Sequence, residues 1–200
     1  MDNGRFPQLI AFDLDYTLWN FWIDTHVEPP LKQNALTGVV YDSANDPTRV
    51  EFFKDVPEIL RGLKSKPEVT IAAASRTAAI KLAREALRLI RIPASPSVGK
   101  DTDTDVADAN RVESLPANDF FDHLEIYPGS KIAHFKQLHK VTGIPYSEML
   151  FFDDETRNEE VEKQLGVTFV WVVDGLNWDC FQEGLREWRK RHAADDNASS

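Results

Sequence analysis

The chain has 200 residues, of which 42% are hydrophobic and 28% are charged, and it carries a formal net charge of −10. These values predict one globular domain over residues 1–192, while the acidic charge, the short apolar runs and the absence of a signal-peptide pattern argue against nucleic-acid or membrane partners. The one cysteine, Cys180, fits a reducing compartment, and we expect a cytoplasmic protein that works as a monomer.

Four short apolar runs contain no alternation of polar and apolar residues. A continuous apolar run of this length is typical of a strand that is buried on both faces of a parallel sheet. In chain order these runs are Leu9–Phe12, Val69–Ala74, Met149–Phe152 and Val167–Val173.

Segments with helical periodicity separate the predicted strands. The first follows a helix-start composition at Asp55 and has an apolar face at Ile59, Leu60 and Leu63. Strands and helices that alternate in this way predict an α/β fold, a doubly wound parallel sheet with helices on both faces. The further helices are expected at Thr77–Ile90, Ser130–Val141, Asn158–Leu165 and Asp179–His192.

Three segments break this alternation. Asn20–Phe53 is long and irregular, and we expect a short flap or hairpin there, after the first strand. Pro93–Asn118 is polar and acidic and predicts a mobile surface loop, and residues 193–200 predict a disordered tail. Neither internal segment is long enough for a separate α/β cap domain, so we expect an open site.

Polar side chains follow three of the predicted strands at the point where each strand ends. Asp13 and Asp15 follow the first, Ser75 follows the second, and Asp153 and Asp154 follow the third. In an open α/β sheet, ligands bind in the crevice outside the carboxyl ends of the strands. The three clusters therefore predict one common site.

Four carboxylates in a small volume repel one another, so the predicted site needs positive charge. Together with Ser75 and Lys131 they form a set of hard oxygens and one amine, which favours Mg²⁺ and a phosphorylated substrate. Asp13 is then placed to attack phosphorus and form an aspartyl-phosphate, and Asp15 to protonate the leaving oxygen and activate water. Thr17 is expected to orient the loop without taking part in the chemistry.

The residues of these clusters also resemble a known family. The segment FDLDYTL resembles the first motif of the haloacid dehalogenase-like phosphatases, and the resemblance to their eukaryotic magnesium-dependent, acid phosphatase-like branch extends from Leu9 to Val173. It implies a Rossmann-like fold without a cap, Mg²⁺ as the cofactor, and phosphotyrosine or sugar phosphates as substrates. The matching blocks are FDLDYTLWNFWIDTHVEPP, AAASRT, EIYPGSKIAHFKQLHKVTGIP and FFDDETRN.

The resemblance implies roles for the acidic residues. Asp13 matches the nucleophile and a metal ligand. Asp15 matches the acid/base, and its backbone carbonyl matches a second ligand of Mg²⁺. Asp154 matches the remaining metal ligand, while Asp153 is expected to pair with Lys131.

The resemblance also implies a set of substrate-binding positions. Tyr16 and Trp22 either offer an aromatic wall to a phosphotyrosine ring or pack the flap, and the sequence leaves both interpretations open. For Trp19 and Phe21 we expect core packing. The positions that match substrate-binding residues of the family are Leu14, Tyr16, Trp22, Ser75, Arg76 and Lys131.

Two other functions use the same groups. A phospho-receiver domain also has an acidic pocket, Mg²⁺, a hydroxyl and a lysine, but its acidic pair lies on the first strand, whereas here the pair comes last. A catalytically inactive phosphate-binding module is the second alternative. Ser75 alone also fits a plain helix cap. Repeated turnover of a phosphomonoester distinguishes the phosphatase from both alternatives.

Overall fold

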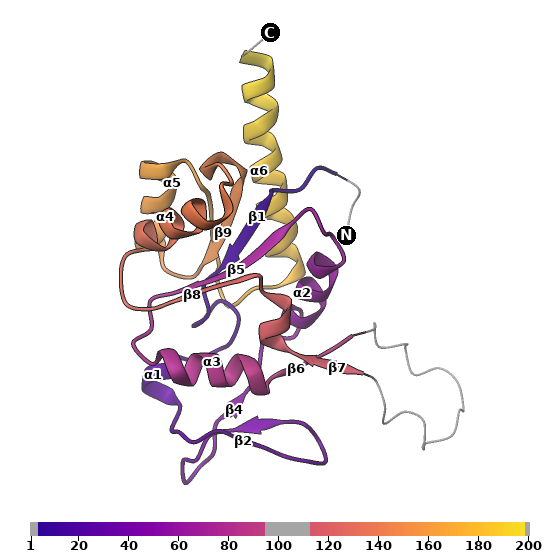
Figure 1. The fold of residues 1–200 in the computed structure, drawn as a ribbon, viewed down its shortest axis with the longest axis vertical. Helices are drawn as coiled ribbons and strands as arrows, with labels where there is room; N and C mark the ends of the chain where they lie inside the picture. Colours follow the sequence, from indigo (N-terminus) through magenta and orange to yellow (C-terminus); the bar gives the residue numbers. More distant parts are fainter. Residues whose placement is uncertain (1–3, 95–112, 199–200) are drawn as a thin grey trace, which may run out of the picture.

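The computed structural model describes residues 4–94 and 113–198, with side chains up to residue 193. A five-stranded parallel sheet lies at the centre, with the strand order β10–β9–β1–β5–β8 (Figure 1). Its strands are β1 (Leu9–Phe12), β5 (Thr70–Ser75), β8 (His123–Ile126), β9 (Met149–Asp153) and β10 (Thr168–Trp171).

Helices cover both faces of this sheet and bury two separate hydrophobic layers. Ile10 and Phe12 of β1 belong to the layer that contains α2, α3 and α6, while Leu9 and Ala11 belong to the layer with α4 and α5. Successive side chains of a strand point to opposite faces, so β1 contributes to both layers. This arrangement confirms the predicted doubly wound α/β fold. The helices are α2 (Val56–Lys64), α3 (Ile80–Leu89), α4 (Lys131–Thr142), α5 (Glu160–Leu165) and α6 (Trp178–Ala198).

The four predicted strands are all present, with ends that agree to within two residues. The fifth strand, β8, is not predicted by the sequence. Its residues His123, Leu124 and Glu125 are half-buried, and two of the three are polar; β8 pairs only with β5. A strand of this kind lacks the continuous apolar run that identifies the central strands.

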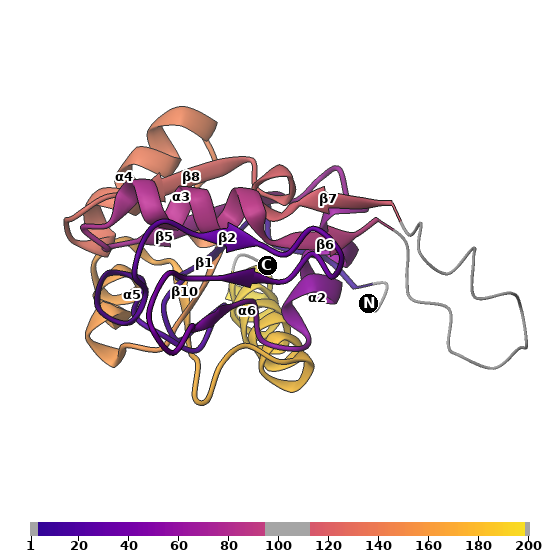
Figure 2. The same cartoon turned by 90° about the horizontal axis from the view of Figure 1, so that it is seen from below.

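Residues 20–53 form the expected flap at the carboxyl end of β1. It contains the short helix α1 (Ile23–His26) and three antiparallel strands, and Figure 2 shows it lying across this end of the molecule. The amide of Gln33 donates to the backbone carbonyl of Leu89 at 2.9 Å, which ties the flap to α3. The flap strands are β2 (Lys32–Gln33), β3 (Val40–Tyr41) and β4 (Arg49–Val50).

The segment predicted as one loop, Pro93–Asn118, is partly ordered into regular structure. β6 (Arg91–Pro93) and β7 (Ser114–Pro116) pair in antiparallel fashion, and a 3₁₀ turn follows at Ala117–Phe120. The ends of the segment are held because Ile92 and Ala117 are fully buried in the core. Residues 95–112, the rest of the predicted mobile loop, lie outside the described residues.

The last helix, α6, continues to Ala198, so the prediction that the helix ends at His192 is wrong. The segment after His192 contains no proline or glycine, and alanine has the highest helix propensity. No helix in the described part of the chain is long and apolar enough to cross a membrane.

His134 is a fully buried histidine on α4, the helix that also carries Lys131. Its Nε2 lies 3.0 Å from the backbone carbonyl of Tyr127, which only accepts, so Nε2 carries the proton of the neutral ring. Burial, together with the nearby charge of Lys131, lowers the pKa of His134 to about 4. The folded protein therefore keeps this ring neutral below the pH at which an exposed histidine becomes charged.

The pKa of His134 predicts a loss of stability on acidification. Between the unfolded pKa of about 6.5 and the folded pKa, only the unfolded state binds the proton, so the stability contribution is complete above this window and falls as pH decreases through it. From pH 7.5 to pH 5 we expect the wild type to lose about 2 kcal/mol more than His134→Gln, whose amide also reaches the Tyr127 carbonyl. Urea unfolding at both pH values measures this difference, and parallel losses in the two proteins contradict the prediction.

Candidate functional site

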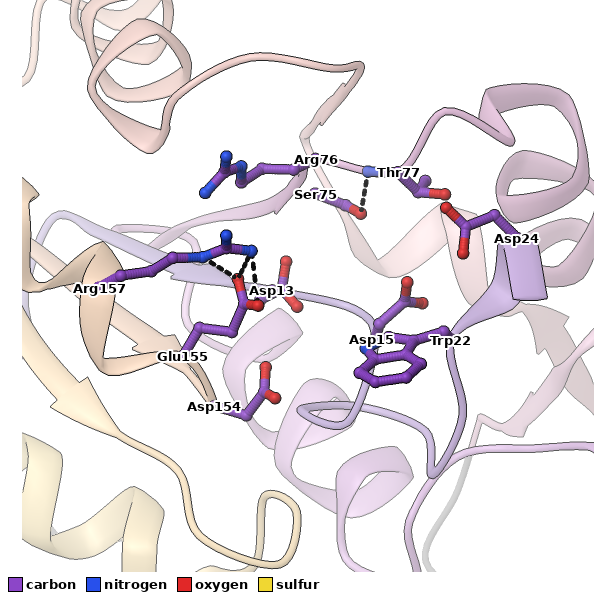
Figure 3. Close-up of a pocket in the computed structure, with 10 residues that line it drawn as sticks. All are labelled: Asp13, Asp15, Trp22, Asp24, Ser75, Arg76, Thr77, Asp154, Glu155 and Arg157. Carbon is purple, nitrogen blue, oxygen red and sulfur yellow. Dashed lines mark hydrogen bonds and ion pairs between the residues drawn. The ribbon is translucent and has the colours of Figure 1, made fainter. Parts of the chain in front are cut away.

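A pocket of about 170 Å³ opens at the carboxyl ends of β1, β5 and β9 (Figure 3). The three polar clusters predicted from the sequence therefore meet in space, and the flap forms another wall of the pocket. The predicted site residues that line it are Asp13, Asp15, Trp22, Ser75, Arg76 and Asp154.

Lys131 lies at the start of α4, is 1% exposed and does not line the pocket itself. Its ammonium group contacts Asp13 Oδ1 at 2.5 Å and Asp153 Oδ2 at 3.0 Å, and it also donates to the backbone carbonyl of Ala74. Burial alone would lower the pKa of Lys131, but the attraction of Asp13 and Asp153 outweighs burial and raises it. One charged lysine thus joins the ends of β1, β5 and β9.

Three carboxyl groups of the pocket have raised pKa values. Burial raises the pKa of Asp13 well above its usual value, and repulsion from Asp153 and Asp15 acts in the same direction against the attraction of Lys131. Burial raises the pKa of Asp15 to about 6. Burial, followed by repulsion from Asp153, raises the pKa of Asp154 to about 6. The negative charge here is only partly compensated, which favours a positive ligand.

The two residues of the acidic pair have different surroundings. Asp153 is fully buried, and each of its carboxylate oxygens accepts a hydrogen bond from the Asn158 amide at 2.9 Å. Its Oδ1 also accepts from the backbone N–H of Glu155 at 2.8 Å, and its Oδ2 contacts Lys131. These partners occupy Asp153 inside the protein. Asp154 is partly exposed and lines the pocket, so it is the member of the pair that faces a ligand.

The loop after β1 positions Asp15 and Asp154. The buried hydroxyl of Thr17 accepts a hydrogen bond from the backbone N–H of Asp154 at 3.1 Å, which agrees with a loop-orienting role. Asp15 Oδ1 accepts from Trp19 Nε1 at 2.7 Å and from the backbone N–H of Ile23 at 3.3 Å. Among the described residues Asp15 Oδ2 has no such partner, and the carboxylate points into the pocket (Figure 3).

The donor atoms of the pocket fit a magnesium ion. Asp13 and Asp154 offer carboxylates from neighbouring strands, and the Asp15 carbonyl is a further oxygen on the same loop. Within residues 4–94 and 113–198, no group of three or more acidic, histidine or cysteine side chains is placed to hold a metal. Mg²⁺ suits this sparse set because it keeps several waters and binds through one or two carboxylates and phosphate oxygens.

Ser75 and Arg76 bring polar and positive groups to the opposite side of the pocket from Asp154 (Figure 3). Ser75 is 1% exposed, and its hydroxyl accepts from the backbone N–H of Thr77 at 3.3 Å, so it orders the turn after β5 while it lines the pocket. The Arg76 guanidinium donates to Asn158 Oδ1 at 3.3 Å. This side of the pocket suits the oxygens of an anion.

The three residues Leu14, Tyr16 and Trp22 are placed differently from one another. The Leu14 side chain is fully buried among apolar groups of the core and does not line the pocket, so the substrate-binding role of residue 14 stays a prediction. Trp22 is 49% exposed and lines the pocket, and its ring meets the Tyr16 ring edge-on at 5.3 Å. Trp19 and Phe21 are buried, as the sequence predicts, and the structure shows in addition that their rings stack.

Several residues at the site receive no role from sequence reasoning. Asn158 links Asp153 to Arg76, and the exposed Arg157 forms a bidentate pair with Glu155 at 2.6–2.9 Å. Their positions within the block FFDDETRN are a signal, but their contacts depend on how the turn after β9 folds. The pocket-lining residues without a predicted role are Asp24, Thr77, Glu155 and Arg157.

The sequence of this chain is similar to a known protein family and to individual proteins of yeast and human. Residues 5–191 match the acid phosphatase family. A "HAD-like hydrolase superfamily protein" of Schizosaccharomyces pombe is 44% identical over 169 residues, which cover 84% of this chain and 87% of that protein. Human "Magnesium-dependent phosphatase 1" is 41% identical over 187 residues, which cover 94% of this chain and 90% of that protein.

A solved structure has the same fold. It is the N-terminal part of a Bacteroides fragilis protein that contains a phosphatase domain, determined in complex with magnesium. It superimposes with a TM-score of 0.51 and 16% identity, and the match covers 86% of this chain and 37% of that one. At this identity the likeness concerns the fold alone.

Proposed function

Because the chain belongs to the acid phosphatase family, within the haloacid dehalogenase-like hydrolases, we propose that it is a Mg²⁺-dependent phosphomonoester hydrolase that works through an aspartyl-phosphate on Asp13. The observation that carries the proposal is the pair formed by Asp13 and Lys131. The lysine holds Asp13 Oδ1 at 2.5 Å, while the Asp13 side chain still reaches the pocket. A fixed, oriented carboxylate at the end of β1 is what in-line attack on phosphorus requires.

The proposed reaction has two halves. In the first, Asp13 Oδ2 forms a bond to phosphorus, the bond from phosphorus to the alcohol oxygen breaks, and Asp15 gives that oxygen a proton. In the second, the oxygen of a water molecule attacks phosphorus while Asp15 takes a proton from that water, and the bond between phosphorus and Asp13 breaks. Inorganic phosphate leaves, and both aspartates return to their starting states. The Oδ2 atom of Asp15, which has no hydrogen-bond partner in the described part of the chain, and its place in the pocket support this role.

The proposed metal ligands are Asp13, Asp154 and the backbone carbonyl of Asp15. Mg²⁺ bound there neutralises charge on the phosphoryl oxygens and on the attacking carboxylate. The raised pKa values of Asp13 and Asp154, the oxygen-only donors and the name of the human relative support this assignment. Ser75 and Arg76 are proposed to bind the phosphoryl oxygens, and Lys131 to screen the charge of Asp13.

The proposed substrate is phosphotyrosine on a protein, with sugar phosphates as the second class. The exposed ring of Trp22 lines the pocket, stacks on His26 at 5.5 Å and is buttressed by Tyr16. A rigid aromatic wall beside a phosphate site favours an aryl phosphate over an aliphatic one. No separate cap domain covers the pocket in the described part of the chain, which leaves room for a side chain on a protein.

Removal of the metal tests the proposed function. We expect the wild type to hydrolyse p-nitrophenyl phosphate in Mg²⁺, and excess EDTA to lower kcat by at least about 100-fold, because several kcal/mol of charge stabilisation are lost. Added Mg²⁺ should restore the rate, whereas Ca²⁺, which prefers more ligands at longer distances, should not.

The outcome that contradicts the proposal is a folded protein, checked by circular dichroism, with no turnover in Mg²⁺ or with equal turnover in EDTA. Given turnover, the substrate class follows from kcat/KM values for a phosphotyrosine peptide, the matching phosphoserine peptide and a hexose phosphate. A phosphotyrosine value that is not above the other two removes the aryl preference and leaves the general phosphatase.

A further inference from the structure

A second recess lies directly beside the pocket and shares Asp154 with it. Its volume is about 470 Å³, compared with about 170 Å³ for the pocket. Figure 3 shows Asp154 at the lower edge of the pocket, on the side away from Arg76. The apolar walls of the recess come from three separate parts of the chain, and they are Tyr16, Phe53, Trp171, Val172 and Val173.

The size of the pocket shows why the neighbouring space matters. Sites that bury a whole small ligand usually measure about 300–1,000 Å³. At about 170 Å³, the pocket has room for a phosphoryl group and the first atoms attached to it. The remainder of any substrate must lie outside, and the recess is the adjoining space.

The recess exposes apolar surface that the fold does not need to expose. Trp171 is 55% exposed and Val173 is 54% exposed, and they are two of the seven large apolar side chains exposed in the described residues. Their gathering around one opening is unlike the scattered apolar residues of an ordinary surface. The carboxylates at its edge, Asp154 and Asp174, disfavour an acidic occupant.

The recess is also rigid and tied to the catalytic loop. The Trp171 indole donates to the backbone carbonyl of Asp154 at 2.8 Å, which fixes the plane of the ring. The backbone N–H of Leu176 donates to the carbonyl of Thr17 at 2.9 Å, and that of Phe53 donates to the carbonyl of Leu18 at 2.8 Å. These bonds hold the walls in register with the loop that carries Asp13 and Asp15.

Gly175 allows two of these walls to touch. Its φ is +83°, and a Cβ atom at this position would lie 2.4 Å from the Phe53 ring. Only glycine combines that backbone conformation with so close an approach. A surface that is preformed in this way loses little conformational freedom on binding.

From these observations we propose that the recess is a substrate subsite for an apolar side chain next to the phosphorylated residue of a peptide. The inference rests on the proposed phosphatase function and adds sequence preference to it. Continuity with the pocket through Asp154 allows one extended segment to occupy both spaces. The aromatic and aliphatic walls select an apolar neighbour, and the two carboxylates at the edge act against an acidic one.

Binding of two matched peptides tests the proposal without turnover. Both carry a phosphonomethyl-phenylalanine, which resembles phosphotyrosine and resists hydrolysis. The leucine peptide has leucine at the position before and at the position after this residue, and the serine peptide has serine at the same two positions. Fluorescence anisotropy in Mg²⁺ gives the two Kd values for the wild-type protein. We expect the leucine peptide to bind about tenfold more tightly, as burial of one apolar side chain predicts.

Two matched variants locate the effect. Val173→Asp places a charge on the recess wall and should reduce the preference for leucine to less than about threefold. Val141→Asp is the control, because Val141 on α4 is 48% exposed, close to the 54% of Val173, and lines neither the pocket nor the recess. This variant should keep the wild-type preference for the leucine peptide.

Three results each contradict the proposed subsite. They are equal wild-type affinities for the leucine and serine peptides, binding of neither peptide, and an unchanged preference for leucine in Val173→Asp. Hydrolysis of p-nitrophenyl phosphate by the same preparation is read separately. Turnover without a peptide preference rejects the subsite alone, whereas absence of turnover rejects the phosphatase.

Discussion

Replacement of Asp13 by asparagine is expected to lower kcat for p-nitrophenyl phosphate by at least about a thousand-fold, the scale found when a nucleophile is removed. The amide cannot form the aspartyl-phosphate, and it also loses the charge that Lys131 and the metal recognise. Asparagine has nearly the same shape, so the buried surroundings of residue 13 are retained. Steady-state kinetics measure the loss, and circular dichroism checks the fold.

A direct observation of the intermediate strengthens this test. Acid quenching during turnover should trap a hydroxylamine-sensitive phosphoryl group on the wild type and none on Asp13→Asn. Asp46→Asn, which alters an exposed acid in the flap away from the pocket, is the matched control and should turn over normally. An Asp13→Asn protein with more than about a tenth of wild-type kcat rules out Asp13 as the nucleophile.

Replacement of Lys131 by methionine is expected to destabilise the protein by about 3–5 kcal/mol, the usual result of breaking a buried ion pair. Methionine fills much of the same volume, but it leaves the buried carboxylates of Asp13 and Asp153 without their cation. The backbone carbonyl of Ala74 loses its donor as well. Urea unfolding measures the change in the free energy of unfolding.

The origin of that loss is tested by a second substitution. In the Lys131→Met background, Asp153→Asn removes one uncompensated charge and should recover about 1–3 kcal/mol, although the same change in the wild type is destabilising. Lys163→Met is the control, because the exposed pair of Lys163 with Glu159 contributes less than about 1 kcal/mol. A Lys131→Met protein that unfolds like this control refutes a structural role for the buried ammonium group.

Much of the fold follows from the sequence because its central strands are buried on both faces. Burial on both faces produces continuous apolar runs such as Leu9–Phe12 and Met149–Phe152, and a carboxylate that interrupts such a run marks the end of the strand. The parallel arrangement then brings those ends together. Strand β8 escapes prediction because three of its four side chains are half-buried and polar residues interrupt its apolar ones.

The finer features of the site depend on contacts between distant segments. The sequence predicts Asp153 and Asp154 as a pair, but it does not predict that one carboxylate points inward and the other outward. That difference follows from Asn158, which donates to the Asp153 carboxylate, and from Thr17, which accepts from the backbone N–H of Asp154. The burial of Leu14 likewise follows from the turn at Tyr16, whose φ of 52° takes the chain out of its extended path. Local periodicity contains no information on such turns.

The direction of α6 has a practical consequence for attaching the molecule to a solid support. The helix runs for 21 residues, a length of about 30 Å, and its C-terminal end points away from the flap (Figure 1). An affinity tag placed after this helix therefore anchors the molecule by the end opposite the pocket. A sensor surface prepared in this way presents every immobilised molecule with its pocket toward the flowing solution.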